Sequence, residues 1–272
     1  VTFRSIQHTL NLEQVYVLGT NCADNSPTPK AAQSFLQNGV GVDMNKNVLG
    51  YEFMQDYRVH VKLEDNDNKN GDSTLYMKKP YFCLPGTIAK EAIAKSCLTC
   101  FDYTNAVADI VIGYMGAPLD STMEESYQTI TVRNKRGEAM VQTALEQNRI
   151  QMGPIASGSG NYQTASVATV SSDSIIMEMM DQKIPSEGMP VWMGNIMADF
   201  LKTVGPKGLN FARYSIDYHI LRNYLYTLYV WGENRATKCM PQYALDIVDQ
   251  YSNDKTFVSV KETILKKRQL SK

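Results

Sequence analysis

The chain has 272 residues, of which 43% are hydrophobic and 20% are charged, and its net charge at pH 7 is -1. This length and apolar fraction allow a sizeable core and exclude collagen-like, low-complexity and wholly disordered chains. Because 27 basic residues nearly balance 28 acidic ones, no broad positive surface for nucleic acid is expected. Five cysteines are too scattered for a disulfide scaffold, and no apolar run has the length of a membrane-spanning helix.

The start of the chain does not resemble a natural N-terminus. It begins at Val1 rather than at a methionine, and it enters an ordered-looking pattern at once. Nothing there has the pattern of a signal or transit peptide. We therefore expect a processed N-terminus or the loss of an upstream segment.

Short strands are predicted in the first half of the chain. The patterns that predict them cover residues 15–18, 57–63, 108–115 and 127–133. In the second of these, Arg58, His60 and Lys62 alternate with apolar residues, which indicates a half-buried strand. His60 is accordingly expected at the surface.

Helices are predicted mainly in the second half. Their apolar patterns cover residues 138–147, 195–203, 209–231 and 241–251. Residues 153–174 are rich in Gly, Ser, Thr and Asn and predict a long loop, and the basic tail after Lys261 is expected to fray.

The order of these elements predicts an α+β fold, a mixed sheet with flanking helices and a helical C-terminal segment. We divide it into an α+β region at 1–150, a long loop region at 151–188 and a helical region at 189–272. The helical region is expected to pack on the same core.

The cysteines offer the sharpest chemical pattern. Cys97 and Cys100 form a C-x2-C pair, in which one tight turn can aim both thiolates at one metal centre. Cys22 and Cys83 each follow a connection that contains glycine or proline, and four thiolates would complete a [4Fe–4S] cluster. Structural zinc, a redox dithiol at the C-x2-C pair and buried thiols without a metal are the alternatives. Cys239 is expected to be an ordinary thiol.

A second candidate is the strand-to-helix turn at residues 129–137. Backbone N–H groups at a helix start bind anions, and Arg133 or Arg136 would add charge-assisted bonds to a phosphate, as in FAD. The motif alone favours the simpler interpretation, a solvated turn with ordinary basic residues.

A third candidate lies in the helix predicted at 209–231. Tyr218 and His219 are candidate proton donors on a wall of rings for a large flat ligand. The favoured structural alternative is a polar helix face. The Met-rich segment 177–197, with Trp192, can line an apolar pocket, although core packing is the usual role of Met.

Several longer motifs resemble the C-terminal part of the coenzyme F420 hydrogenase beta-subunit family. They lie at residues 19–22, 51–57, 80–85, 96–105 and 108–116. Residues 130–134 and 205–224 are similar to the branch of that family that acts on chlorins in photosynthetic organisms. The resemblance covers nearly the whole chain.

The resemblance implies FAD and [4Fe–4S] clusters as cofactors, with reduced ferredoxin as the electron donor. It implies cluster ligation by Cys22, Cys97 and Cys100, with Cys83 as the fourth ligand. The residues that would contact the flavin are Tyr103, Thr104, Asn105, Thr131 and Arg133.

The implied activity is reduction of a substituent on a chlorophyll-type substrate, namely removal of the hydroxyl of a 7-hydroxymethyl group or reduction of an 8-vinyl group. Family members carry an upstream cysteine-rich module, which this chain is expected to lack. The alternative to an enzyme is a shortened, non-catalytic relative that serves as a structural subunit of a photosynthetic membrane complex. The expected location is the chloroplast stroma or thylakoid surface, or the cytoplasm of a cyanobacterium, and a homo-oligomer is among the expected assemblies.

Overall fold

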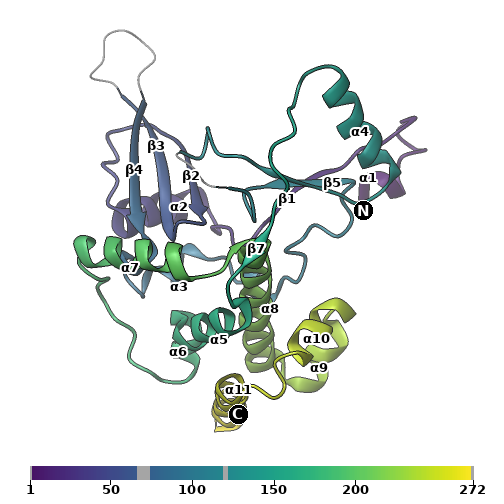
Figure 1. Cartoon of the computed structure of the whole chain (residues 1–272). Coiled ribbons are helices and arrows are strands. Elements are labelled where there is room, and N and C mark those ends of the chain that lie inside the picture. The colour runs from purple at the N-terminus through teal and green to yellow at the C-terminus, as the bar shows by residue number, and fades with distance from the viewer. Residues whose placement is uncertain (1, 66–73, 119–121, 271–272) are drawn as a thin grey trace.

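A computed structural model of the chain describes residues 2–65, 74–118 and 122–270, and it confirms the α+β fold. Two three-stranded sheets lie side by side, and helices of the C-terminal half gather around the long helix α8 (Leu209–Trp231) (Figure 1). A short helix, α1 (Thr2–Ser5), precedes the first strand. No helix in the described part of the chain is both long and apolar enough to cross a membrane.

The first sheet has the order β1-β5-β6. Its strands are β1 (Leu18–Thr20), parallel to β5 (Ile110–Gly113), and β6 (Thr129–Val132), antiparallel to β5. Helix α4 (Lys135–Glu146) follows β6. The strands predicted at 108–115 and 127–133 are confirmed in shortened form, whereas the strand predicted at 15–18 overlaps β1 only at Leu18. The Val17 backbone N–H bonds to the side chain of Asp109 just before β1 begins.

The second sheet is an antiparallel meander. Its strands are β2 (Val48–Met54), β3 (Arg58–Glu64) and β4 (Thr74–Pro80), in the order β2-β3-β4. Before it come α2 (Pro29–Ser34) and the π-helix η1 (Phe35–Val40), and Val59, Val61 and Leu63 of β3 pack against apolar residues of η1. The predicted strand at 57–63 is confirmed, and its apolar face is fully buried.

The prediction that β3 is only half-buried is wrong. Its polar face is also covered, since Arg58 is 9% exposed and His60 is 0% exposed. Helix α7 (Val191–Val204) packs on this side and bonds to Arg58. Strand β4 leads into η2 (Tyr81–Cys83) against α7, then to α3 (Ile88–Ala92) and η3 (Cys97–Thr99).

The long loop predicted at 153–174 is wrong in its second half, which forms the helix α5 (Tyr162–Ser172), and α6 (Ser174–Met179) follows directly. Asn161 caps α5, and Asp173 caps α6 through its side chain. The segment lacks a strong apolar pattern, but Val170 is 1% exposed because α5 packs along α8. Tertiary packing therefore outweighs the composition that suggested a loop.

Helix α8 matches the predicted range 209–231 at both ends. Its core side chains Ile220, Leu221, Leu225 and Leu228 are each at most 1% exposed. The helices α9 (Glu233–Cys239), α10 (Gln242–Asp249) and α11 (Lys255–Leu270) surround it, and a short β7 (Gly158–Ser159)–β8 (Lys207–Gly208) pair lies at its start. The tail predicted to fray forms α11 instead, because Phe257, Val260 and Ile264 are buried.

Candidate functional site

Two cysteine-bearing segments meet against α8. Cys22 follows the end of β1, Cys97 begins η3 and Cys100 follows it. The Cys97 Sγ lies 3.8 Å from the backbone oxygen of Asn25, in the segment of Cys22. Partial burial raises the pKa of the Cys22 thiol, although the residue keeps access to solvent, and the nearby charges of Cys97 and Cys100 raise it further. The structure therefore brings three of the four predicted cluster cysteines together.

Two adjacent residues of α8 hold these segments in place. Arg222 donates from both terminal nitrogens to the carboxylate of Asp24, at 2.8 and 2.7 Å. The Asn223 side-chain amide donates to the backbone oxygens of Cys97 and Cys100, at 2.8 and 2.7 Å. Arg222 and Asn223 are 1% and 3% exposed. Because buried polar groups of this kind are stable only when fully paired, they fix both cysteine segments to the same helix.

Cys83 lies on a different element. It ends η2, is 5% exposed, and its Sγ lies 3.8 Å from the backbone oxygen of Pro190. A Cβ built on Gly194 of α7 would stand 2.1 Å from this sulfur, so the thiol fills the close approach between η2 and α7. Its role as the fourth ligand stays a prediction. Cys239, expected to be an ordinary thiol, is exposed on α9.

The three grouped thiols fit a [4Fe–4S] cluster in their donor chemistry. The side chains of Cys22 and Cys100 are exposed, and the Cys100 Sγ accepts the backbone N–H of Asp102 at 3.5 Å. Within the described ranges, no three Cys, His, Asp or Glu side chains stand close enough to hold a single metal ion. Which metal centre the three thiols would hold, an iron–sulfur cluster or zinc, stays a prediction.

The segment predicted to contact the flavin lies directly beside Cys22. The Cys22 backbone N–H donates to the oxygen of Tyr103 at 3.3 Å. The Arg133 guanidinium donates to the backbone oxygen of Thr104, and Asn105 has the left-handed φ of 50°. Four of the five predicted flavin contacts thus adjoin the grouped thiols.

These residues fit a flavin only in part. Thr131 and Arg133, two residues apart at the end of β6, are exposed and project from the same side. The Tyr103 ring is 6% exposed, stacks on His219 with centroids 5.0 Å apart, and its hydroxyl shares a hydrogen bond with Ser215 at 2.7 Å. The Tyr103 ring is therefore occupied, and a flavin would be held through Thr131, Arg133 and the backbone at 104–105.

The strand-to-helix turn at 129–137 has its donors already engaged. The Asn134 side chain accepts from the backbone N–H groups of Arg136 and Gly137, at 3.0 and 3.1 Å. The Arg136 Nε lies 3.2 Å from Asp109, whose side chain is 0% exposed. This geometry supports the simpler interpretation of the turn over a phosphate site at the start of α4.

His219 is a buried, neutral imidazole at the edge of the site. Its Nδ1–H donates to the backbone oxygen of Ser215 at 2.6 Å, and its Nε2 lies 3.8 Å from the Asp24 carboxylate. Burial and the charge of Arg222 lower its pKa to about 4, although Asp24 and the bond to Ser215 oppose this shift. The free Nε2 lone pair therefore faces the segment of Cys22 as a proton acceptor.

Tyr218 stands beside His219 and is held from both sides. Its hydroxyl donates to Asp173 at 2.6 Å, and the Arg222 guanidinium lies 5.5 Å from the centre of its ring. Burial and the charge of Asp173 raise the pKa of Tyr218 well above its ordinary value, so the phenol stays protonated. With Tyr214 stacked at 6.3 Å, the predicted row of rings is present, but it packs against protein.

The Met-rich segment lies outside this site. On α7, Trp192, Ile196, Phe200 and Val204 follow one another at i, i+4 spacing and are 55–64% exposed. They form an open apolar stripe.

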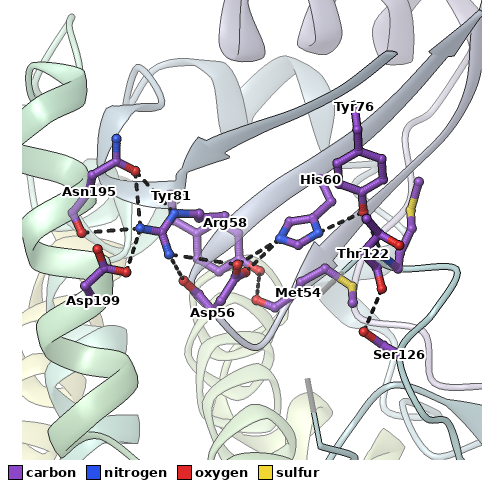
Figure 2. A network of polar contacts seen from close by, with 11 residues as sticks. Met54, Asp56, Arg58, His60, Tyr76, Tyr81, Thr122, Ser126, Asn195 and Asp199 are labelled. Carbon is purple, nitrogen blue, oxygen red and sulfur yellow. Dashed lines mark hydrogen bonds and ion pairs between the residues drawn. The ribbon is translucent and has the colours of Figure 1, made fainter. Parts of the chain in front are cut away.

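A second polar network lies between the β2-β3-β4 sheet and α7 (Figure 2). The His60 Nε2 contacts both Asp56 oxygens at 3.0 and 2.9 Å, and its Nδ1 lies 2.9 Å from the Tyr76 hydroxyl. Arg58 bonds to Asn195 and Asp199 of α7. Burial alone would raise the pKa of Asp56, but the hydrogen bond and charge of His60, with Lys78 and Arg58, lower it. The contacts all join elements of the fold, so we assign this network a structural role.

We expect Asp56→Asn to lower the free energy of unfolding by about 2 kcal/mol at pH 7, since a buried charge-assisted hydrogen bond to His60 is lost. The folded pKa lies below 3.8, so the carboxylate stabilises the fold above that pH and loses this effect as the pH falls through the folded pKa. Urea unfolding from pH 7 to pH 3 should show the two proteins converging in acid. Asp199→Asn, at a side chain that is 69% exposed, should have a much smaller effect.

Sequence reasoning missed this network. It placed His60 at the surface, yet Arg58, His60 and Lys62 stand at alternate positions of β3 and so share one face of the strand, while Asp56 lies in the turn just before it. An arginine and a histidine on one strand face, with an acidic residue in the turn before that strand, were the available signal.

Comparison with known proteins finds a family and similar chains. A model of the C terminus of the beta subunit of coenzyme F420 hydrogenase/dehydrogenase matches residues 2–158. The chain is 43% identical over 253 residues to 7-hydroxymethyl chlorophyll a reductase, chloroplastic, of Oryza sativa subsp. japonica, an alignment that covers 92% of this chain and 50% of the relative. It is 38% identical over 248 residues to an uncharacterized protein of Nostoc sp., an alignment that covers 91% of this chain and 55% of the relative. The chain thus spans about half the length of the curated relatives it matches.

Proposed function

Because this chain belongs to the coenzyme F420 hydrogenase/dehydrogenase beta-subunit family, we propose that it is the redox-cofactor-binding part of a reductase of chlorophyll metabolism. The reaction we propose is reduction of 7-hydroxymethyl chlorophyll a to chlorophyll a, with ferredoxin as the electron donor. The 43% identity to the rice protein of that name supports this choice of substrate. The name of the rice protein includes the word chloroplastic, which supports a location in the chloroplast.

One observation carries the proposal. Cys22, Cys97 and Cys100 meet beside the segment 103–105, next to the exposed Arg133. A thiolate-bound iron–sulfur cluster and a flavin would therefore be held within one small region. Electron transfer between two cofactors needs this proximity, and the protein supplies distance, polarity and protons.

The proposed reaction sets what the chain must provide. Converting a hydroxymethyl to a methyl group consumes two electrons and two protons and releases one water. The cofactors supply the electrons when bound. On the protein side, the bond from Nδ1–H to Ser215 fixes the tautomer of His219 and leaves Nε2 to accept and pass a proton beside Asp24.

The test is anaerobic purification followed by spectroscopy and assay. We expect iron, sulfide and flavin in the protein, and reduced ferredoxin should drive conversion of 7-hydroxymethyl chlorophyll a. An iron-free and flavin-free protein would refute the redox proposal. Turnover of divinyl chlorophyllide instead would still show a chlorin reductase, but one that reduces an 8-vinyl group and not a 7-hydroxymethyl group.

A second candidate function is a structural subunit of a photosynthetic membrane complex. The exposed stripe on α7, with Trp192 and Phe200, favours this candidate because a large open apolar surface is typical of an interface. It predicts a cofactor-free protein that co-purifies with a larger complex, and replacement of Cys97 by Ser would leave that association intact.

A further inference from the structure

A pocket of about 540 Å³ lies where the end of α8 meets α9 and the last turn of α11 (Figure 1). Its walls include Trp231, Gly232, Arg235, Lys238 and Arg268. This volume is in the range of pockets that bind small molecules. None of the residues assigned above to the thiol group or to the flavin segment lines it, so it is a separate feature of the fold.

Two arginines are held in place at this pocket. The Arg268 Nε donates to the backbone oxygen of Tyr229 at 2.9 Å, and no described residue accepts a bond from its two terminal nitrogens. Gly232, with a left-handed φ of 82°, lets this guanidinium lie against the chain, since a Cβ there would stand 2.8 Å from the Arg268 Nη2. The Arg235 guanidinium carbon lies 5.1 Å from the centre of the Trp231 ring, a cation–π contact. Both charges are therefore placed before any ligand binds.

The positive charges of the pocket have no acidic partners among the described residues. Glu233 is the only acidic residue among the described residues that line the pocket, and it pairs with Lys261 at 3.5 Å. The ion pairs between described residues do not include Arg235, Lys238 or Arg268. Because Arg235 and Lys238 stand three residues apart on α9, their side chains are also neighbours on that helix.

This arrangement differs from that of the arginines that hold the fold together. Arg58 and Arg222 each bond to an aspartate, at 2.9 and 2.7 Å. In the pocket, three cations gather without a counter-charge in a chain whose net charge is -1. Like charges this close repel one another, and an anion between them would remove that cost.

A phosphate group suits these donors. A guanidinium presents a planar fork of N–H groups that matches two phosphate oxygens, and a lysine adds a mobile point charge. A phosphate monoester carries about two negative charges and three acceptor oxygens, enough for donors that come from separate parts of the pocket.

We propose that this pocket between α8, α9 and α11 binds a phosphate-bearing anion through Arg235, Lys238 and Arg268. The inference goes beyond the proposed function and does not depend on it, because binding here requires neither the cluster nor the flavin.

The test uses the fluorescence of Trp231 in the full chain. The only other tryptophan is Trp192, which is 64% exposed on α7, so the variant Trp192→Phe isolates the signal of the pocket. Titration with sodium pyrophosphate at constant ionic strength should give a saturable change in this fluorescence. It should also raise the melting temperature, since a ligand that binds only the folded state stabilises it. Adding Arg235→Gln and Lys238→Gln to this variant should weaken the affinity about tenfold or more, because two charge-assisted bonds are lost.

Lys30→Gln/Lys202→Gln in the same background is the matched control. It also removes two positive charges, from exposed positions on α2 and α7, and it should bind pyrophosphate as its parent does. Circular dichroism checks that both double variants are folded. Equal affinities in the pocket variant and its parent, or the same fluorescence change with sodium chloride alone, would overturn the proposal.

Sedimentation with vesicles of phosphatidylglycerol and phosphatidylcholine distinguishes the source of the phosphate. Vesicle binding that the pocket variant loses, without a response to pyrophosphate, would assign the pocket to a lipid headgroup. A response to pyrophosphate without vesicle binding would assign it to a soluble phosphate. Binding of neither probe would overturn the proposal, and it would leave the iron and flavin contents that test the proposed function unaffected.

Discussion

Arg222→Met should lower the free energy of unfolding by about 3–5 kcal/mol, the range for removing one partner of a buried ion pair. Arg222 is 1% exposed, and Asp24, whose side chain is 22% exposed, would keep its charge without the paired guanidinium. Asn223 would lose the two bonds that its side-chain oxygen accepts from Arg222. Urea unfolding of the cofactor-free chain measures the loss.

The double variant Arg222→Met/Asp24→Asn tests this explanation. Removing the unpaired charge should restore part of the lost stability, which an effect of Arg222 packing alone would not permit. As a comparison, Lys90→Met removes an ion pair to Glu178 between exposed side chains, and we expect a far smaller change. Equal losses in Arg222→Met and Lys90→Met would contradict the assignment of Arg222 as an anchor of the site.

Cys97→Ser should abolish the iron content of the purified protein while leaving it folded. The serine hydroxyl is similar in size but is a poor ligand for iron in a cluster, for which thiolates are the usual donors. Iron and sulfide analysis, with circular dichroism as the check on folding, measures the two effects separately. Cys239→Ser is the matched control, since Cys239 is exposed on α9, and it should keep its full iron content.

The same assay decides the role of Cys83. Its sulfur packs against Gly194 and Pro190, on another element from the three grouped thiols. Full iron content in Cys83→Ser would assign this thiol to the contact between η2 and α7, whereas loss of iron would establish it as the fourth ligand. Retention of iron in Cys97→Ser would refute the three-thiol site itself.

Local periodicity predicted the elements that carry their own apolar pattern. The helix at 209–231 has the predicted ends because its stripe of Ile and Leu residues is continuous, and Gly232 stops it. The strand at 57–63 was equally visible from its alternation. What covered its polar face was not visible, because Asn195 and Asp199, which bond to Arg58, lie more than 130 residues further along the chain.

The site was predictable in its residue types but not in its geometry. The C-x2-C spacing placed Cys97 and Cys100 together, and the connections before Cys22 and Cys83 suggested these two as further ligands, as the family resemblance also implied. No local pattern indicated that Arg222 and Asn223 would hold these segments, because a polar pair within an apolar helix has many possible partners. For the same reason the separate position of Cys83, and the grouping of Arg235 with Arg268 at one pocket, required the packed structure.

The bond between Asp24 and Arg222 joins residues 198 positions apart. At synthesis rates of about 5–20 residues per second, the ribosome needs about 10–40 s between these two residues. Throughout that interval the first cysteine segment lacks its anchor, so its thiol stays open to oxidation or to adventitious ions. For the proposed cluster, insertion of iron and sulfide would therefore follow translation of α8, and a carrier that shields the nascent thiol would increase the yield of loaded protein.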